Sequence, residues 1–463
     1  MPKAALHNLG CKVNAYETEA MEQLLRSAGY EIVPFDQEAD VYVINTCSVT
    51  NIADRKSRQM LHRAKKLNPR AVVVAAGCYV QVAAEQLKAD PAVDILIGNN
   101  QKGQLVEILE EFGREGEKEP HVMEIGHTSH YEELKVDQPG ERTRAFLKVQ
   151  DGCNQFCSYC IIPYARGRVR SRRLEDVRAE VEKLAAAGYQ EVVLTGIHLS
   201  SYGLDFEKQL SGREESAKEE CQRDYQTGNQ GKNGRWLLEL IRQVSQVEKI
   251  RRIRLGSLEP RIVTEEFART LAANDKICPH FHLSLQSGSN SVLRRMNRHY
   301  TPQEYEECCE NLRRAFRNPA ITTDVIVGFP GETEEEFEET REFAKRIHFY
   351  EMHVFKYSRR AGTRAAVMAG QIPESVKGER SERLLELEAW MSLEYRKSLL
   401  GTVQEVLLEE EEELDGRKFI AGYTRQYVRT AIPMEKELRS GQILQVKMKE
   451  LLNNETVVGE IVR

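Results

Sequence analysis

Hydrophobic and polar residues in the region 1–112 alternate between two patterns with different periods. Apolar runs of strand length recur at four places, 3–9, 41–45, 71–76 and 93–97. Amphipathic helical patterns separate them, at 14–28, 52–67 and 81–87. Strands that alternate with helices are typical of parallel βαβ units. The pattern therefore predicts an α/β protein whose N-terminal domain, 1–112, is a doubly wound parallel sheet.

A second alternating series follows a polar, weakly periodic stretch at 113–140, which we interpret as a linker. Six strand-like runs recur in it, at 145–150, 191–195, 252–255, 280–286, 321–327 and 352–357. A full barrel of this type has eight βα units, so the region 141–374 is expected to form a partial, TIM-like (β/α)6 barrel. The polar stretch 204–234 interrupts the pattern, and we expect it to be a mobile surface insertion.

The remaining chain changes pattern twice. A helical pattern at 375–400 predicts a connecting helix, and short β-rich runs fill the region 401–463. These runs lie at 402–408, 419–432, 442–448 and 455–462. They predict a small antiparallel β-barrel as the C-terminal domain.

The composition of the chain mainly excludes classes of protein. The chain has 463 residues, of which 41% are hydrophobic and 30% are charged, and its mean hydropathy is −0.53. Its apolar runs are far shorter than the roughly 20 residues that cross a bilayer, and the N-terminus lacks the apolar segment of a secretion signal. We therefore expect a cytoplasmic protein with no membrane partner. The net charge of −6 argues against indiscriminate nucleic-acid binding, although the stretches 54–70 and 163–173 are basic.

Three cysteines lie close together after the first strand of the second series. Cys153, Cys157 and Cys160 have the spacing C-x3-C-x2-C, with no fourth Cys or His nearby. Structural zinc is usually closed by four protein ligands, whereas three thiols suit a cubane iron–sulfur cluster that leaves one iron open. The spacing therefore predicts an iron–sulfur cluster with a free iron site. The alternative is a zinc loop whose fourth ligand lies far away in the sequence.

Three further cysteines occupy equivalent positions in the N-terminal domain. Cys11, Cys47 and Cys78 each come directly after a predicted strand and before a predicted helix. The carboxyl ends of parallel strands form one ligand-binding edge of an open sheet. These thiols are therefore expected to converge on a second metal site, again with three ligands. The alternative for each of them is a buried structural thiol.

With these motifs the chain resembles the radical S-adenosylmethionine (SAM) methylthiotransferases, which carry a C-terminal domain called TRAM. The segments Leu-Gly-Cys-Lys-Val-Asn at 9–14, Asn-Thr-Cys-Ser-Val-Thr at 45–50 and Ala-Asp-Arg-Lys-Ser-Arg-Gln-Met at 53–60 are similar to one branch of that family. That branch converts N6-threonylcarbamoyladenosine, at position 37 of tRNA beside the anticodon, to its 2-methylthio form. The isopentenyladenosine-modifying branch typically has Gln-Met in place of Lys12 and Val13.

The resemblance implies two [4Fe-4S] clusters with different tasks. A cluster on Cys153, Cys157 and Cys160 would reduce SAM, and the resulting radical would abstract the hydrogen from C2 of the adenine ring. The cluster on the N-terminal cysteines would hold the sulfur, which a second SAM methylates before transfer. The implied partners are the tRNA anticodon stem-loop and a reductant such as flavodoxin or ferredoxin. The sulfur donor stays open.

The resemblance also implies which loop residues hold SAM. They end or follow predicted strands, and they are Tyr159, Thr195, Gly196, Ser257, Glu259 and Gln286. Tyr159 is expected along the adenine of SAM, and Glu259 at the ribose hydroxyls. Loop packing is the alternative role for Tyr159, and the glycines and prolines of these loops, including 328–331 after Asp324, serve equally well as turns.

The candidate RNA contacts are arginines. Arg166, Arg168, Arg170 and Arg172 follow the cysteine loop, and Arg425 lies among aromatic residues of the C-terminal domain. Arginine pairs bidentately with phosphate, so the first four are candidates to contact the RNA backbone or the threonyl carboxylate of the substrate. Aromatic residues stack on splayed RNA bases. The alternatives are SAM contacts or internal salt bridges for the first four and ordinary barrel packing for Arg425.

Two other functions compete with tRNA methylthiolation. An enzyme that methylthiolates an aspartate of a small-subunit ribosomal protein would suit the acidic C-terminal domain, but the arginine-rich stretch 163–173 argues against it. A non-catalytic iron–sulfur protein that binds RNA would leave the SAM-type loops without a role.

Overall fold

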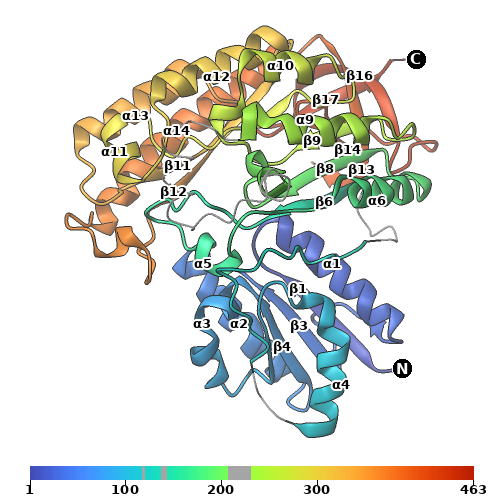
Figure 1. Ribbon diagram of the computed structural model, residues 1–463. Helices are drawn as coiled ribbons and strands as arrows, with labels where there is room; N and C mark the ends of the chain where they lie inside the picture. Colours follow the sequence, from blue (N-terminus) through green and yellow to red (C-terminus); the bar gives the residue numbers. More distant parts are fainter. Residues whose placement is uncertain (117–119, 137–142, 207–230, 415, 463) are drawn as a thin grey trace.

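The computed structural model describes residues 1–463 except 117–119, 137–142, 207–230, 415 and 463. The N-terminal domain lies below the other two in Figure 1 and contains a five-stranded sheet in the order β2-β1-β3-β4-β5. All its strand pairs are parallel. The strands are β1 (Lys3–Asn8), β2 (Glu31–Ile32), β3 (Val41–Thr46), β4 (Val72–Gly77) and β5 (Ile95–Ile97). The short strand β2 was not predicted.

Helices cover both faces of this sheet, so the predicted doubly wound arrangement is confirmed. The helices are α1 (Lys12–Ser27), α2 (Asn51–Leu67), α3 (Cys78–Lys88) and α4 (Leu105–Glu115), with a 3-10 turn at Lys102–Gln104. Met21 and Leu25 of α1 share one hydrophobic core with Leu105 of α4. Leu61 of α2 and Val80 of α3 belong to the core on the opposite face.

The stretch expected as a polar linker is packed against the protein instead. Helix α4 runs to Glu115, beyond the expected end of the domain at 112. In the described part, 120–136, Leu134 and Val136 are buried against Tyr16 of α1. The hydroxyl group of Tyr131 donates to the carbonyl of Lys148 at 2.7 Å. Apolar residues spaced along an irregular chain therefore dock it without forming a helix or strand.

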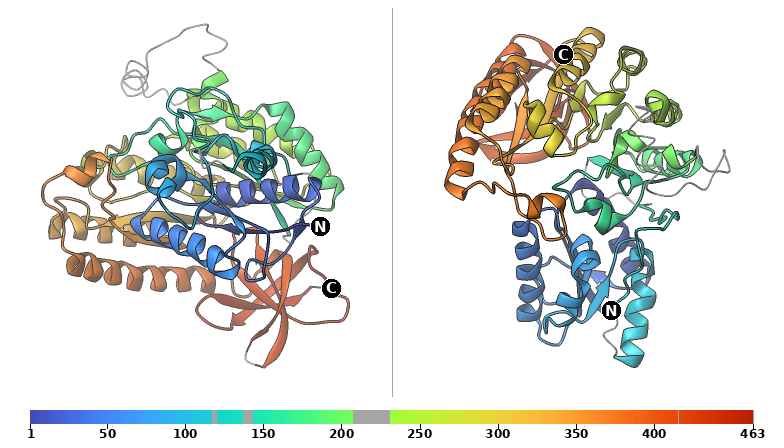
Figure 2. Two further views of the ribbon diagram at one scale, coloured as in Figure 1. Left: turned by 90° about the horizontal axis from the view of Figure 1, so that it is seen from below. Right: turned by 60° about the vertical axis from the view of Figure 1, so that its left-hand side comes forward.

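The central domain is the predicted partial barrel, with its helices on the outside (Figures 1 and 2). Its strands are β6 (Arg144–Asp151), β7 (Arg170–Ser171), β8 (Glu191–Gly196), β9 (Arg252–Leu255), β10 (His280–His282), β11 (Ala320–Val327) and β12 (Glu351–Lys356). Its helices are α5 (Ile162–Arg166), α6 (Leu174–Ala186), α9 (Gly231–Ser245), α10 (Glu265–Ala272), α11 (Asn290–Arg295), α12 (Pro302–Ala315) and α13 (Glu334–Ile347). Short 3-10 turns lie at Leu199–Ser201, Pro260–Ile262 and Arg364–Val367.

The barrel strands form two sheets rather than one. Their orders are β7-β6-β8-β9 and β10-β11-β12, and isolated bridges such as Leu258–Leu283 join them. Strand β10 ends at His282, whereas the sequence predicted a strand to 286. Gln286 has a φ angle of 71°, which is incompatible with an extended strand. Of the predicted insertion, 207–230 lies outside the described residues.

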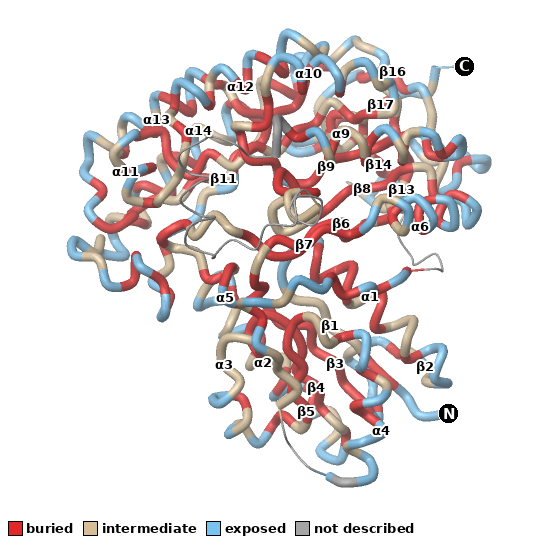
Figure 3. The backbone as a smooth tube through the Cα atoms, viewed as in Figure 1, coloured by how far each residue is buried: buried red, intermediate tan, exposed pale blue. Residues whose placement is uncertain are grey.

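The two faces of the barrel strands differ in character. Ile321, Val325 and Val327 of β11 pack into the large core beneath the outer helices. Side chains alternate along a strand, so Thr322 and Asp324 point to the concave face. Figure 3 shows the buried strands lying between the exposed helices and the N-terminal domain. Helix α1 of that domain lies against the concave side of β6, where Lys148 and Glu17 form an ion pair at 2.8 Å.

Helix α14 (Glu374–Ser398) connects the partial barrel to the C-terminal domain. That domain is a closed β-barrel in the order β13-β14-β15-β17-β16 (Figure 2). Its strands are β13 (Val403–Leu414), β14 (Arg417–Thr424), β15 (Arg429–Pro433), β16 (Ile443–Leu451) and β17 (Thr456–Ile461). The pair β15–β17 is parallel and the others are antiparallel.

One predicted strand of this barrel, 419–432, is two strands. A turn separates β14 from β15, and within it the amide of Tyr427 donates to the carbonyl of Thr424 at 3.0 Å. Tyr427 has a φ angle of 70°, so the chain cannot continue there as a strand. In the part of the chain that the structure describes, no helix is both long and apolar enough to cross a membrane.

Candidate active site

The fold brings the three N-terminal cysteines to one edge of the sheet. Cys11 precedes α1, Cys47 follows β3, and Cys78 is the first residue of α3. A Cβ atom added at Gly10 would lie 2.9 Å from the Sγ atom of Cys47. Burial, together with the neighbouring Cys78 and Cys11, raises the pKa of the Cys47 thiol to about 12. The expected triad therefore exists as a spatial cluster.

The second triad lies in the loop between β6 and α5. The amide of Cys160 donates to the carbonyl of Cys157 at 3.0 Å, which closes a tight turn. Burial, together with the nearby Cys157, raises the pKa of the Cys153 thiol to about 12. The pKa of Cys160 is raised as well, first by burial and then by the other two thiols. The three thiols therefore lie close together, with Cys153 and Cys157 buried and Cys160 partly buried.

The thiol spacing tests which metal group suits the two triads. Tetrahedral zinc places its sulfur ligands about 3.8 Å apart, given Zn–S bonds of about 2.3 Å. Within the described residues, no set of three metal-ligand atoms within 4.8 Å of one another includes any of these six cysteines. A cubane cluster presents its irons at separate corners and accepts thiolates further apart. Each triad therefore fits a four-iron cluster better than a single zinc ion.

Arg298 adds a contact that sequence reasoning missed. Its Nη1 atom donates to the Sγ atom of Cys157 at 3.4 Å, and its Nε atom donates to the hydroxyl of Tyr300 at 3.1 Å. The Arg298 guanidinium thus provides a positive charge beside a prospective thiolate. No local signal marks it, because Arg298 lies more than a hundred positions after the cysteine loop.

The residues expected to hold SAM surround the cysteine loop at the carboxyl ends of the strands. The Tyr159 hydroxyl donates to Oε1 of Gln286 at 3.0 Å. Glu259 is buried, and its carboxylate accepts a hydrogen bond from Arg261 at 2.9 Å. Thr195 and Gly196 end β8. Ser257 is exposed just after β9. The arrangement keeps all six as candidates for SAM binding.

Arg166 lies inside the protein, away from any RNA-accessible surface. Its Nη1 atom donates to Oε1 of Glu17 at 2.8 Å, and its Nε atom donates to the Sγ atom of Cys78 at 3.2 Å. Asp151 accepts from the same guanidinium at 3.2 Å. Burial alone would raise the pKa of Glu17, but Arg166, Lys102 and Lys148 hold it well below its usual range. Arg166 thus joins the cysteine loop to the N-terminal triad.

The other four arginines have different environments. Arg172 is buried, and its Nε atom donates to Oε2 of Glu133 at 2.9 Å. Arg170 is buried and donates to the carbonyl groups of Arg166 and Arg168 at 2.9 and 3.0 Å. Arg425 donates to the carbonyl of Ile277 at 2.8 Å, which ties the C-terminal barrel to the central domain. Arg168 is only partly buried and lies over the ring of Phe156 at 4.6 Å. Of these expected RNA contacts, Arg168 is the one best placed at the cysteine loop.

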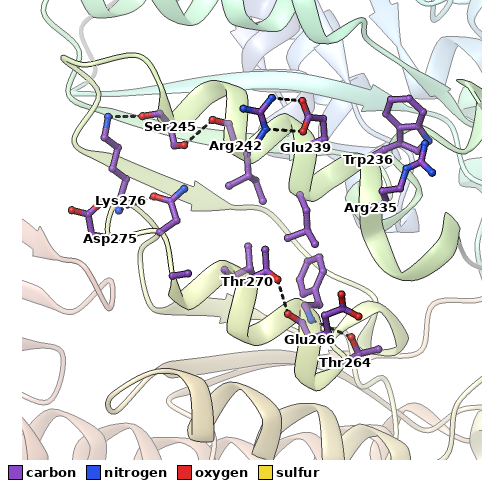
Figure 4. A pocket seen from close by; sticks show the side chains of 16 residues that line it. Arg235, Trp236, Glu239, Arg242, Ser245, Thr264, Glu266, Thr270, Asp275 and Lys276 are labelled. Atoms are coloured by element: carbon purple, nitrogen blue, oxygen red, sulfur yellow. Dashed lines mark hydrogen bonds and ion pairs between the residues drawn. The ribbon is translucent and has the colours of Figure 1, made fainter.

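A groove on the outside of the barrel is separate from this site. It lies between α9 and α10, has a volume of about 910 Å³, and is lined by residues such as Trp236, Phe267 and Lys276 (Figure 4). None of the six cysteines and none of the expected SAM residues line it. We assign it no role in the chemistry.

Comparisons with known proteins match two family models to the two regions that hold the cysteine triads. The radical SAM superfamily matches residues 147–344, and a family described as uncharacterized protein family UPF0004 matches residues 3–98. The threonylcarbamoyladenosine tRNA methylthiotransferase MtaB of Bacillus subtilis is 42% identical over 97% of this chain and 94% of its own length. The Aquifex aeolicus protein of the same name is 41% identical over 90% and 95%. The chain belongs to the radical SAM methylthiotransferase family.

The family includes relatives that act on a different nucleoside. The tRNA-2-methylthio-N(6)-dimethylallyladenosine synthase of Moorella thermoacetica is 38% identical, over 97% of each chain. Among solved structures, the radical SAM methyltransferase TsrM from Kitasatospora setae matches with a TM-score of 0.51 at 16% identity, over 79% of this chain and 75% of that one. That likeness concerns the fold alone. Members of the methylthiotransferase family use SAM and two [4Fe-4S] clusters, in accordance with the two thiol triads.

Proposed function

We propose that this protein methylthiolates C2 of N6-threonylcarbamoyladenosine at position 37 of tRNA. The observation that carries the proposal is the pair of thiol triads on adjoining edges of two domains, linked by the hydrogen bond from Arg166 to Cys78. Two relatives named for this nucleoside, at 42% and 41% identity, support this substrate. A relative named for dimethylallyladenosine is 38% identical, and others named for threonylcarbamoyladenosine are 34% identical, so the support comes from the two most similar of these relatives.

The residues of the chain would divide the work. When bound, SAM and the two clusters supply the radical chemistry and the sulfur. Cys153, Cys157 and Cys160 would hold the cluster that binds SAM, and the N-terminal triad would hold the cluster that carries sulfur. The pair Tyr159–Gln286 would orient the adenine of SAM. Burial of the loop would exclude water from a reactive intermediate.

The wider setting of the reaction follows from its chemistry. Reduction of the SAM-binding cluster requires a low-potential electron donor, for which flavodoxin or ferredoxin is suited. A tRNA substrate and reduced thiol ligands both match the cytoplasm. Arg168, partly exposed over Phe156, would meet the RNA near the cysteine loop.

Nucleoside mass spectrometry of tRNA from a strain lacking this gene tests the proposal. The 2-methylthio form of threonylcarbamoyladenosine should disappear and the unmodified form should accumulate. The wild-type gene should restore it, whereas Cys47→Ala and Cys157→Ala should not. Cys308→Ala, which changes a buried cysteine of α12 outside both triads, is the matched control and should restore it. Loss of 2-methylthio-isopentenyladenosine instead would assign the protein to the other branch.

A further inference from the structure

A group of polar side chains on the concave face of the barrel has no role in the proposed chemistry. His282, Asp324 and His353 come from the neighbouring strands β10, β11 and β12, and one ligand atom from each lies within 4.8 Å of the others. Asp324 and His353 are direct partners across the β11–β12 pair. Asp324 is partly exposed and His353 exposed, so solvent reaches this face.

The hydrogen bonds leave part of this group free for a ligand. Nδ1 of His282 lies 3.0 Å from Oγ1 of Thr322, and its Nε2 lies 3.2 Å from Oδ2 of Asp324. His282 is therefore anchored through Nδ1, while its Nε2 faces the Asp324 carboxylate without a hydrogen bond. His353 stacks on the His282 ring at 5.9 Å and makes no hydrogen bond or ion pair with any residue in the described ranges. Its ring nitrogens remain free to bind a ligand.

The surrounding charge favours an anion. Charge interactions link Lys12, at the start of α1, with Arg254, Arg144, Glu191 and the imidazole of His280. Arg254 is paired with Glu191 at 2.8 Å, and Arg144 is paired with Glu409 at 2.8 Å. Lys12 is exposed and forms no hydrogen bond or ion pair within the described part of the chain. Glu191, the carboxylate in this set, is already paired with Arg254, so positive charge predominates here, which disfavours a divalent cation.

The position of His282, Asp324 and His353 along the strands relates them to the cysteine loop. Towards the amino ends of the strands, the ring of Tyr427 lies under the guanidinium groups of Arg144 and Arg254, at distances of 4.8 and 4.7 Å. Towards the carboxyl ends of the strands, Gln286 pairs with Val325. Val325 follows Asp324, so Gln286 lies about 3 Å further along the strand than Asp324. Gln286 holds Tyr159 beside the cysteines. The group thus lies just below the layer where the chemistry is expected.

We propose that Lys12, His353 and Asp324 bind the threonyl part of the substrate, with Lys12 and His353 donating to its carboxylate. Asp324, positioned by His282, would accept from the threonyl hydroxyl or the adjoining N–H group. The inference rests on the proposed function and names the groups that recognise the substrate. An adenine held beside the cysteine loop, with its N6 substituent directed down the barrel, places the carboxylate at this level. A dimethylallyl group has no polar atom for these side chains.

Kinetics of the reconstituted full-length enzyme test the pocket. The two substrates are anticodon stem-loop RNAs, one with N6-threonylcarbamoyladenosine and one with the methyl ester of its threonyl carboxylate. The wild type should prefer the acid in kcat/KM. His353→Ala and Lys12→Gln should each lower the acid-to-ester ratio about tenfold, mainly through KM for the acid, as expected for one lost charge-assisted hydrogen bond. Unchanged ratios in both variants would overturn the pocket.

Controls separate the pocket from the proposed function. His348→Asn changes a histidine at the end of α13, where φ is 58°, and should leave the ratio unchanged. The iron content of Lys12→Gln must equal that of the wild type, because Lys12 adjoins Cys11. A wild type that converts neither RNA refutes the proposed function itself. If the wild type binds a non-iron divalent metal and His353→Ala does not, the three side chains form a metal site, and the proposed carboxylate pocket is wrong.

Discussion

At the scale of the residue, Arg166 shows how one side chain acquires its role from its surroundings. It is fully buried, yet its guanidinium meets two carboxylates and a thiol. Removal of one partner from a buried ionic network leaves uncompensated charge, which costs about 3–5 kcal/mol. Arg166 is therefore expected to stabilise the interface between domains rather than to bind RNA.

Arg166→Met should lower the free energy of unfolding of the apoprotein by about 3–5 kcal/mol, measured by urea denaturation. The slope of log Kd for tRNA against log salt concentration should stay unchanged, because no phosphate contact is lost. Arg173→Met changes an exposed arginine of the same stretch and should alter stability by no more than about 0.5 kcal/mol. If Arg166→Met has wild-type stability and a shallower salt slope, Arg166 contacts RNA and this prediction is wrong.

At the scale of the element, the turn between β11 and α13 combines glycines of positive φ with a capping box at the start of the helix. Gly328 and Gly331 have φ angles of 69° and 75°, so both serve as turn residues. Thr333 and Glu336 then form a capping box at the start of α13. Glu336 also pairs with Arg295 of α11 at 2.6 Å. The hydrogen bond from Arg295 lowers the pKa of Glu336 to about 2.

Glu336→Gln should destabilise the apoprotein in a pH-dependent way. A carboxyl group whose pKa is lowered on folding stabilises the protein at pH values above its unfolded pKa, near 4.3. That contribution is lost as the pH falls towards the folded value near 2. The difference between wild type and variant in urea unfolding should therefore be largest at pH 5–7 and shrink below pH 4. An equal difference at every pH would contradict this assignment.

At the scale of the whole molecule, the net charge is −6, but one local surface is basic. Helix α2, which follows Cys47, exposes Arg55, Lys56 and Arg63. Arg360, from the loop after β12, pairs with Asp54 of the same helix and also donates to Ser48 at 2.7 Å. The basic helix is thereby held next to the cysteine edge, where an RNA backbone would approach.

Simultaneous change of Arg55, Lys56 and Arg63 to Gln should weaken tRNA binding and flatten its salt dependence. Each lost phosphate contact lowers the magnitude of the slope by about 0.7–0.9, so a loss of up to about 2–3 is expected from binding measured at several salt concentrations. The matched control changes three exposed basic residues of the outer helices, Arg178, Lys183 and Arg242. An equal effect of both triple variants would show a non-specific response to net charge.

The sequence by itself determined the features that depend on local spacing. Periods of apolar residues predicted both α/β domains and the C-terminal β-barrel. The C-x3-C-x2-C spacing predicted one triad, and the position of each N-terminal cysteine after a strand predicted the other. Local pattern failed where the chain leaves regular structure, as at Gln286 and in the packed segment 120–136. Only the tertiary structure decided that Arg298 reaches Cys157, that Arg166 is buried, and that His282, Asp324 and His353 come together on one face. These contacts join distant segments of the chain, so they depend on how strands and domains pack, which no local period of the sequence specifies.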